Sequence, residues 1–141
     1  MDSWKYEDLI ILDYNPLHAF SEFSEIGYQV ELQNKENVDI MLLVPPSPIP
    51  MTYGSITNML EPLGIGYLES FLKENQYENI LSENFRTKQL NRNTFLKYLK
   101  TYNPKIVGIS AMTDNFENGV TIAEYIKEFN ENIVVIFGGP H

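Results

Sequence analysis

Two short apolar runs near the C-terminal end, residues 105–109 and 133–137, constrain the fold of this chain more than any other feature. Both are rich in β-branched residues, and a segment with helical periodicity separates them. The first run leads into Ser110-Ala111 and the second into Gly138-Gly139. This order predicts a βαβ unit with both small-residue loops at one edge of a parallel sheet. Ligands of such sheets bind outside the carboxyl ends of the strands, so these loops are the first candidates for a functional site.

The same alternation continues upstream and predicts the order β-α-β-α-β-α-β from residue 38 onward, with right-handed crossovers. The predicted elements are strand 38–44, helix 62–75, strand 77–81, a helix from Asn91 or Asn93 to Asn103, strand 105–109, helix 115–130 and strand 133–137. The apolar positions that repeat at helical spacing are Leu63, Tyr67, Phe71 and Leu72, then Phe95, Tyr98, Leu99 and Tyr102, then Phe116, Val120, Ala123 and Ile126. The fold class expected is α/β, a flavodoxin-like (Rossmann-like) doubly wound parallel sheet.

The chain divides into two parts by its pattern. Residues 1–37 predict an N-terminal extension with a short strand at 9–12 and a helix over 16–25, and residues 38–141 predict the α/β domain. A doubly wound domain usually has a fifth strand and a final helix. We therefore expect a domain that is C-terminally incomplete, cut from a longer protein; the alternative is that the run at 9–12 pairs with the exposed edge. The Pro-rich loop at 47–61 is long enough to be functional or mobile.

Composition excludes several classes of protein. Acidic residues outnumber basic ones by 19 to 10, the net charge is −9, and no basic cluster is present, which disfavours nucleic acid and anionic membranes as partners. The chain has no cysteine, so it can form no disulfide, thiolate zinc site or cysteine-ligated cluster by itself. No apolar run is long enough to span a bilayer, and the acidic N-terminus lacks signal-peptide features. A cytoplasmic protein is expected.

Common catalytic and nucleotide-binding motifs are missing. The sequence has no GxGxxG, GxxxxGK[ST] or GxSxG. Pro45 and Ser110 stand where a phosphoacceptor receiver domain would need acidic residues. The two histidines, His18 and His141, are poorly placed for a metal or a general base, and Asp114 fits the charge preference of a helix N-terminus. No catalytic residue and no metal ligand is therefore predicted.

The small residues allow two interpretations each. Ser110 could bond only to backbone, and Gly138-Gly139 could form only a turn; together they could leave a trough free of side chains for a large flat ligand. Gly64 and Gly66 weaken the first turn of their helix. Such glycines normally permit a close approach, either of the neighbouring strand or of a bulky ligand.

Four segments resemble a known family. DIMLLVPPSPIP, EPLGIGYLESFLKENQYE, NPKIVGISAMT and IVVIFGGPH together resemble the N-terminal cobalamin-binding domain of B12-dependent radical SAM enzymes. The resemblance covers about residues 38–141 and implies a flavodoxin-like fold that holds cobalamin over the carboxyl ends of its strands.

The resemblance also implies the site. In related domains a Ser-x-Leu motif after the third strand and a Gly-Gly after the fourth contact the nucleotide tail of the cofactor. The cofactor-binding residues implied here are Ser110, Ala111, Met112, Thr113, Gly138, Gly139 and Pro140, with Tyr53, Met59, Gly64 and Gly66 as further contacts. The Asp-x-His-x-x-Gly motif of methionine synthase-like domains is missing. Cobalamin would thus bind without a histidine ligand from the first loop.

The catalytic half of such enzymes needs a Cys-x-x-x-Cys-x-x-Cys motif for a [4Fe-4S] cluster and S-adenosylmethionine. Since this chain has no cysteine, the resemblance implies a cofactor-binding module that is not catalytic alone and serves a downstream radical SAM domain, in a methyltransferase or in an enzyme of oxidation or cyclisation. One alternative is an interaction or regulatory domain of the same fold that has lost the cofactor. Another is a flavin-binding domain, disfavoured because no Ser/Thr-rich phosphate loop follows the first strand.

Overall fold

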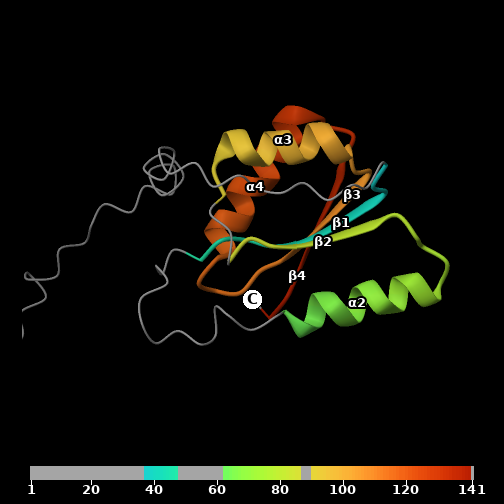
Figure 1. Ribbon diagram of the computed structural model, residues 1–141. Helices are drawn as coiled ribbons and strands as arrows, with labels where there is room; N and C mark the ends of the chain where they lie inside the picture. Colours follow the sequence, from blue (N-terminus) through green and yellow to red (C-terminus); the bar gives the residue numbers. More distant parts are fainter. Residues whose placement is uncertain (1–36, 48–61, 87–89, 141) are drawn as a thin grey trace, which may run out of the picture.

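The computed structural model describes residues 37–47, 62–86 and 90–140 (Figure 1). Its elements are β1 (Ile40–Val44), α2 (Leu63–Glu74), β2 (Ile80–Asn84), α3 (Arg92–Tyr102), β3 (Ile106–Ser110), α4 (Phe116–Phe129) and β4 (Val134–Gly138). This is the predicted order. The elements expected at 9–12 and 16–25, both histidines, Tyr53 and Met59 lie outside the described residues.

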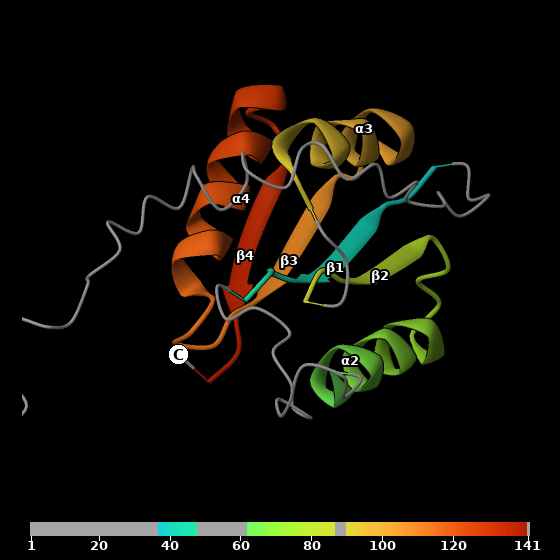
Figure 2. The same cartoon turned by 60° about the vertical axis from the view of Figure 1, so that its left-hand side comes forward.

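The four strands form one parallel sheet in the order β2-β1-β3-β4. Helices α3 and α4 cover one face of the sheet, and α2 lies on the other face (Figure 2). The doubly wound parallel arrangement predicted from the sequence is therefore confirmed. Because all four strands run the same way, their carboxyl ends and the loops that follow them share one edge.

The larger core lies between the sheet and helices α3 and α4. Alternate residues of β1 and β3 point into it, among them Met41, Leu43 and Val107, all fully buried. The ring of Phe85 meets those of Phe95 and Tyr98 edge-on, with centroids 6.1 and 5.5 Å apart. Burial of each such ring contributes about 1.5–3 kcal/mol, which makes this layer the main source of stability.

Helix α3 follows the sequence prediction closely. Asn91 is its N-cap, and the Asn91 side-chain oxygen accepts a hydrogen bond from the Thr94 N–H at 2.8 Å. Asn103 ends the helix in the left-handed conformation at φ 42°. The four apolar residues expected on the inner face are all buried: Phe95, Tyr98, Leu99 and Tyr102.

The predicted inner face of α4 is partly wrong. Val120 is exposed, whereas Ile122 and Ile126 are buried. The reason is Gly119, which lets the helix approach the sheet closely: a Cβ there would lie 3.2 Å from Phe137 Cε1 and 3.4 Å from Ile109 Cγ2. The helix therefore turns Gly119, Ile122 and Ile126 inward, a spacing that a count of apolar residues does not reveal.

The expected face of α2 is also corrected. Leu63 is 84% exposed and Tyr67 77% exposed, and Phe71 lies on the surface with them. The helix attaches to β1 and β2 through buried Ile65 and the partly buried Leu72. Leu63, Tyr67 and Phe71, which repeat at helical spacing, thus lie on the outer side of this helix.

Strand β2 lies three residues downstream of its predicted position. The prediction was 77–81, but the strand runs from Ile80 to Asn84 and includes polar residues that favoured a loop. Its position is set by pairing with β1, in which Ile40 lies opposite Ile80 and Val44 opposite Asn84. Long-range pairing outweighs the local preference.

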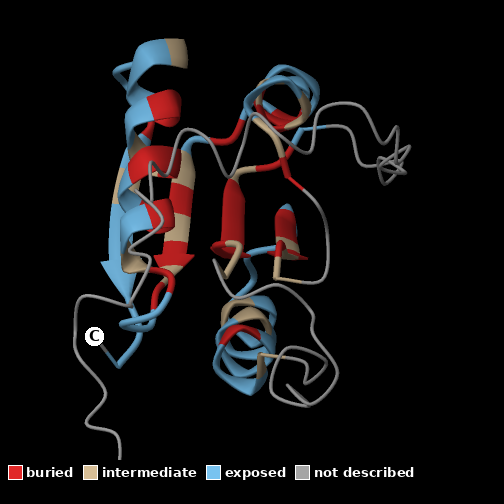
Figure 3. Ribbon diagram, turned by 90° about the vertical axis from the view of Figure 1, so that its left-hand side faces the viewer, coloured by how far each residue is buried: buried red, intermediate tan, exposed pale blue. Residues whose placement is uncertain are grey.

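One region of the sheet is uncovered. Helix α2 packs mainly on β1 and β2, and within the described residues no helix lies over the same face of β4 (Figure 3). Val134 and Ile136 on this face are more than half exposed. The described residues include no helix with the length and apolarity that a membrane crossing requires.

Candidate functional site at the carboxyl edge of the sheet

The carboxyl ends of β3 and β4 lie side by side. Ser110 is the register partner of Gly138, and the Ala111 N–H donates a hydrogen bond to the Gly138 carbonyl at 2.8 Å. The structure therefore brings together the two small-residue loops on which the sequence prediction rested.

A small-residue shelf, defined as Gly108, Ser110 and Gly138, lies at this end of the uncovered face. A Cβ on Gly108 would be 2.9 Å from Leu42 Cδ2, so this glycine lets the Leu42 side chain pack closely over β3. Ser110 points to the same face because strand residues alternate. A Cβ on Gly138 would meet no atom of the described residues within 4 Å. The shelf is open above Gly138 and offers one hydroxyl and backbone groups.

Gly139 has a different role from Gly138. Its φ is +105°, and a Cβ there would lie 2.2 Å from the Ala111 carbonyl oxygen. No other residue type fits this conformation and this contact without displacement. Gly139 thus packs against the loop after β3. Gly138, in contrast, faces space that no described residue fills.

Gly64 and Gly66 in the first turns of α2 are not explained by strand packing. Within the part of the chain that the structure describes, a Cβ on either residue would meet nothing within 4 Å. The first of the two alternatives, close approach of a neighbouring strand, is therefore wrong. Gly66 instead lines a pocket of about 460 Å³ between the start of α2 and the end of β2, with Tyr67, Ser82 and Asn84.

Replacing Gly66 with Ala is expected to raise the free energy of unfolding by up to about 1 kcal/mol. Alanine costs less backbone entropy than glycine in a helix, and the added methyl group meets no neighbour. Urea denaturation of the two chains measures the difference. A loss of stability would mean that the backbone of α2 is approached closely at this point in the folded chain.

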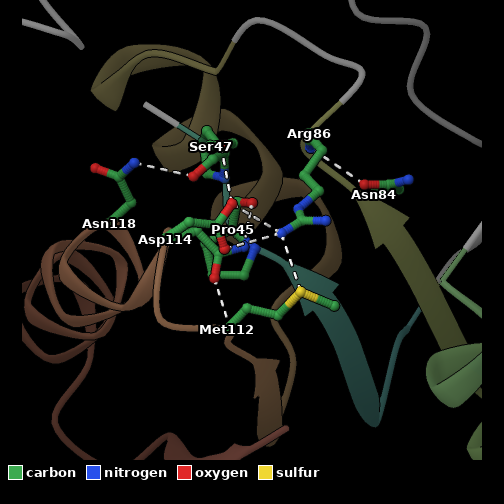
Figure 4. Close-up of polar contacts among 9 residues, drawn as sticks. Pro45, Ser47, Asn84, Arg86, Met112, Asp114 and Asn118 are labelled. Atoms are coloured by element: carbon green, nitrogen blue, oxygen red, sulfur yellow. Dashed lines mark hydrogen bonds and ion pairs between the residues drawn. The ribbon is translucent and has the colours of Figure 1, made fainter. Parts of the chain in front are cut away.

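The loops after β1 and β3 are joined by side chains that the sequence did not point to. Asn115 accepts a hydrogen bond from the Met112 N–H at 2.7 Å and donates one to the Pro45 carbonyl at 3.1 Å. Asn118 donates to the Pro46 carbonyl at 2.9 Å (Figure 4). The only signal in the sequence was a pair of asparagines at the start of a helix.

Asp114 takes part in a second set of contacts at this edge. Arg86, which follows β2, places its Nη2 3.1 Å from each carboxylate oxygen of Asp114 and 3.3 Å from the Met112 sulfur (Figure 4). The Ser47 hydroxyl donates to the same carboxylate at 3.1 Å. Asp114 was expected only to complement a helix N-terminus. Three of the predicted cofactor contacts are exposed: Met112, Thr113 and Pro140.

The side chains with displaced pKa values lie away from the shelf. Burial and the nearby Glu83 raise the pKa of Tyr98 in the core. A hydrogen bond from Lys105 lowers the pKa of Asp39, which precedes β1 at the opposite edge. Within the described part of the chain, no group of three or more His, Cys, Asp or Glu side chains could hold a metal ion. The carboxyl edge therefore offers an open surface and backbone polar groups, which suit the binding of a ligand.

The parallel sheet, the helices on both faces and the open carboxyl edge define a flavodoxin-like α/β domain. The family model of the B12 binding domain matches residues 51–141, which is a more specific assignment than the fold alone gives. The chain belongs to the B12-binding domain family, as the resemblance implied.

Two curated relatives agree with this assignment. The chain is 35% identical over 104 residues to a protein of Pyrococcus horikoshii named as an uncharacterized methyltransferase, a match that covers 72% of this chain and 22% of that protein. It is 29% identical over 80 residues to the anaerobic magnesium-protoporphyrin IX monomethyl ester cyclase of Rubrivivax gelatinosus, covering 57% and 14%. The matches thus span less than a quarter of either relative. No solved structure gives a significant match.

Proposed function

We propose that this chain is the cobalamin-binding module of a B12-dependent radical SAM enzyme, and that the small-residue shelf receives the nucleotide tail of the cofactor. The observation that carries the proposal is the open space above Gly138, next to Ser110, at the carboxyl ends of adjacent strands. Membership of the B12-binding domain family supports the choice of cofactor.

The residues present fit such a group. The tail of cobalamin ends in a flat heterocycle, and a flat ring needs a surface without projecting side chains. Among the described residues, Gly138 leaves the end of β4 bare beside Ser110, and α2 packs mainly on β1 and β2. The Ser110 hydroxyl and the exposed backbone of the loops after β3 and β4 would supply polar contacts.

The cobalt would receive no histidine from the loop after β1. The sequence has no histidine between residues 38 and 140, so the first loop cannot supply an imidazole ligand. Bound cobalamin supplies a cobalt centre that carries or transfers an alkyl group. This chain would bind and orient the cofactor, with Met112, Thr113 and Pro140 as exposed contacts beside the shelf.

The radical chemistry would belong to another part of the enzyme. Because this chain matches less than a quarter of each relative's length and has no cysteine, the iron–sulfur cluster and S-adenosylmethionine would be held by a downstream domain. Residues 1–37 would form a separate extension. The exposed β4 is where a further strand would complete the sheet.

The purified chain is expected to retain hydroxocobalamin after desalting, seen as a corrin absorption spectrum at close to one equivalent. Flavin mononucleotide, tested in the same way, should pass through, since no phosphate loop follows β1. If the folded chain retained no corrinoid, the alternative of an interaction domain without cofactor would hold. Retention of flavin would instead favour the flavin-binding alternative.

A further inference from the structure

Met112 is fixed at both ends although it adds little to the core. Its backbone N–H is bonded to Asn115, and its sulfur contacts Arg86 Nη2 at 3.3 Å. The side chain remains 45% exposed. An unbranched methionine on a surface normally moves among many rotamers unless a neighbouring group holds it. The neighbouring group here is the guanidinium of Arg86.

Arg86 is itself held firmly. Its side chain is only 10% exposed, its backbone N–H donates to Asn84 Oδ1 at 3.1 Å, and its Nη2 contacts both oxygens of Asp114. Charge-assisted hydrogen bonds of this kind are among the strongest in proteins, and a buried charge without its partner is costly. The Arg86 side chain is therefore held in one position beside the loop after β3.

We infer that Arg86 is a positioning residue, which with Asp114 holds Met112 and the loop after β3 in the conformation that accepts the corrinoid. This inference rests on the proposed function. The ion pair links the loop after β2 to the loop after β3, and the Ser47 hydroxyl adds the loop after β1. A loop that is ordered before binding loses less entropy when the ligand arrives. Arg86 thus acts through Met112 and Asp114 and needs no contact with the cofactor.

The test compares Arg86→Gln with the unaltered chain in two measurements. The first is the NMR spectrum of ¹³C-methyl-methionine protein without cofactor, with the Met112 signal assigned through Met112→Leu. The Met112 methyl should move toward its rotationally averaged position in Arg86→Gln. The second is titration with hydroxocobalamin, in which affinity should fall roughly tenfold or more. Arg86→Lys, which keeps the charge and loses the fork geometry, should be intermediate.

Arg92→Gln is the matched control. It removes the exposed Arg92–Glu128 ion pair, 3.0 Å long, between α3 and α4, and should leave both measurements unchanged. Asp114→Asn should weaken binding, and adding Arg86→Gln to it should cost less affinity than Arg86→Gln costs alone, because the two residues share one ion pair.

The outcomes separate the two claims. If the unaltered chain binds hydroxocobalamin and Arg86→Gln binds it equally well, or if the Met112 methyl is unaffected, the inference is overturned and the proposed function stands. If the unaltered chain binds no corrinoid, the proposed function fails, and the inference fails with it. Urea denaturation of each variant shows that lost affinity is not lost folding.

Discussion

Replacing Gly138 with Trp is expected to abolish retention of hydroxocobalamin while changing the free energy of unfolding by no more than about 0.5 kcal/mol. The side chain would enter open space, because no atom of residues 37–47, 62–86 or 90–140 lies within 4 Å of a Cβ at this position. The indole would then occupy the shelf beside Ser110, where the nucleotide tail is proposed to lie. Corrin absorbance after desalting measures retention, and urea denaturation measures the free energy of unfolding.

Val134→Trp is the control for that experiment. Val134 lies on the same face of the same strand, is exposed, and stands at the amino end of β4, opposite Ile106. A bulky residue there should leave retention intact. Retention by a folded Gly138→Trp chain would show that the tail does not use the shelf. Loss of retention in both variants would extend the binding surface over the whole uncovered face.

Replacing Gly139 with Ala is expected to lower the free energy of unfolding by about 1–3 kcal/mol. The residue sits at φ +105°, and the new methyl carbon would lie 2.2 Å from the Ala111 carbonyl oxygen. The loop after β4 must move away from the loop after β3, with loss of packing between them. The change is measured as a shift of the urea midpoint at constant slope.

Gly138→Ala provides the comparison for this second prediction. It adds the same methyl group one residue earlier, in the strand and without a clash, so stability should stay within about 0.5 kcal/mol of the unaltered chain. Equal effects of the two alanines on stability would contradict the division of roles between the glycines.

Local signals explain which elements were predicted well. Helix α3 has an asparagine at each end and four apolar residues on one face, all within one segment, and the structure agrees. Helix α4 differs because Gly119 decides which face approaches the sheet, and that depends on Phe137 and Ile109 far along the chain. Strand β2 differs because its extent is set by pairing with β1.

The candidate site was predictable only to the level of its loops. The βαβ pattern placed Ser110 next to Gly138 because consecutive parallel strands often pair. The different roles of Gly138 and Gly139 depend on backbone conformation, which identical residue letters do not reveal. The contact of Arg86 with Asp114 depends on strand order, since it joins loops separated by 28 residues.

The order β2-β1-β3-β4 has one more consequence. After β1 the chain turns to α2 on one face, and after β3, its neighbour, the chain turns to α4 on the other face. The two connections diverge, and ligands of such sheets bind outside the carboxyl ends of the strands at this switch point. Strand order therefore favours the end of β3, which carries Ser110, as the place of binding, and Gly138 on the adjacent strand shapes the surface beside it.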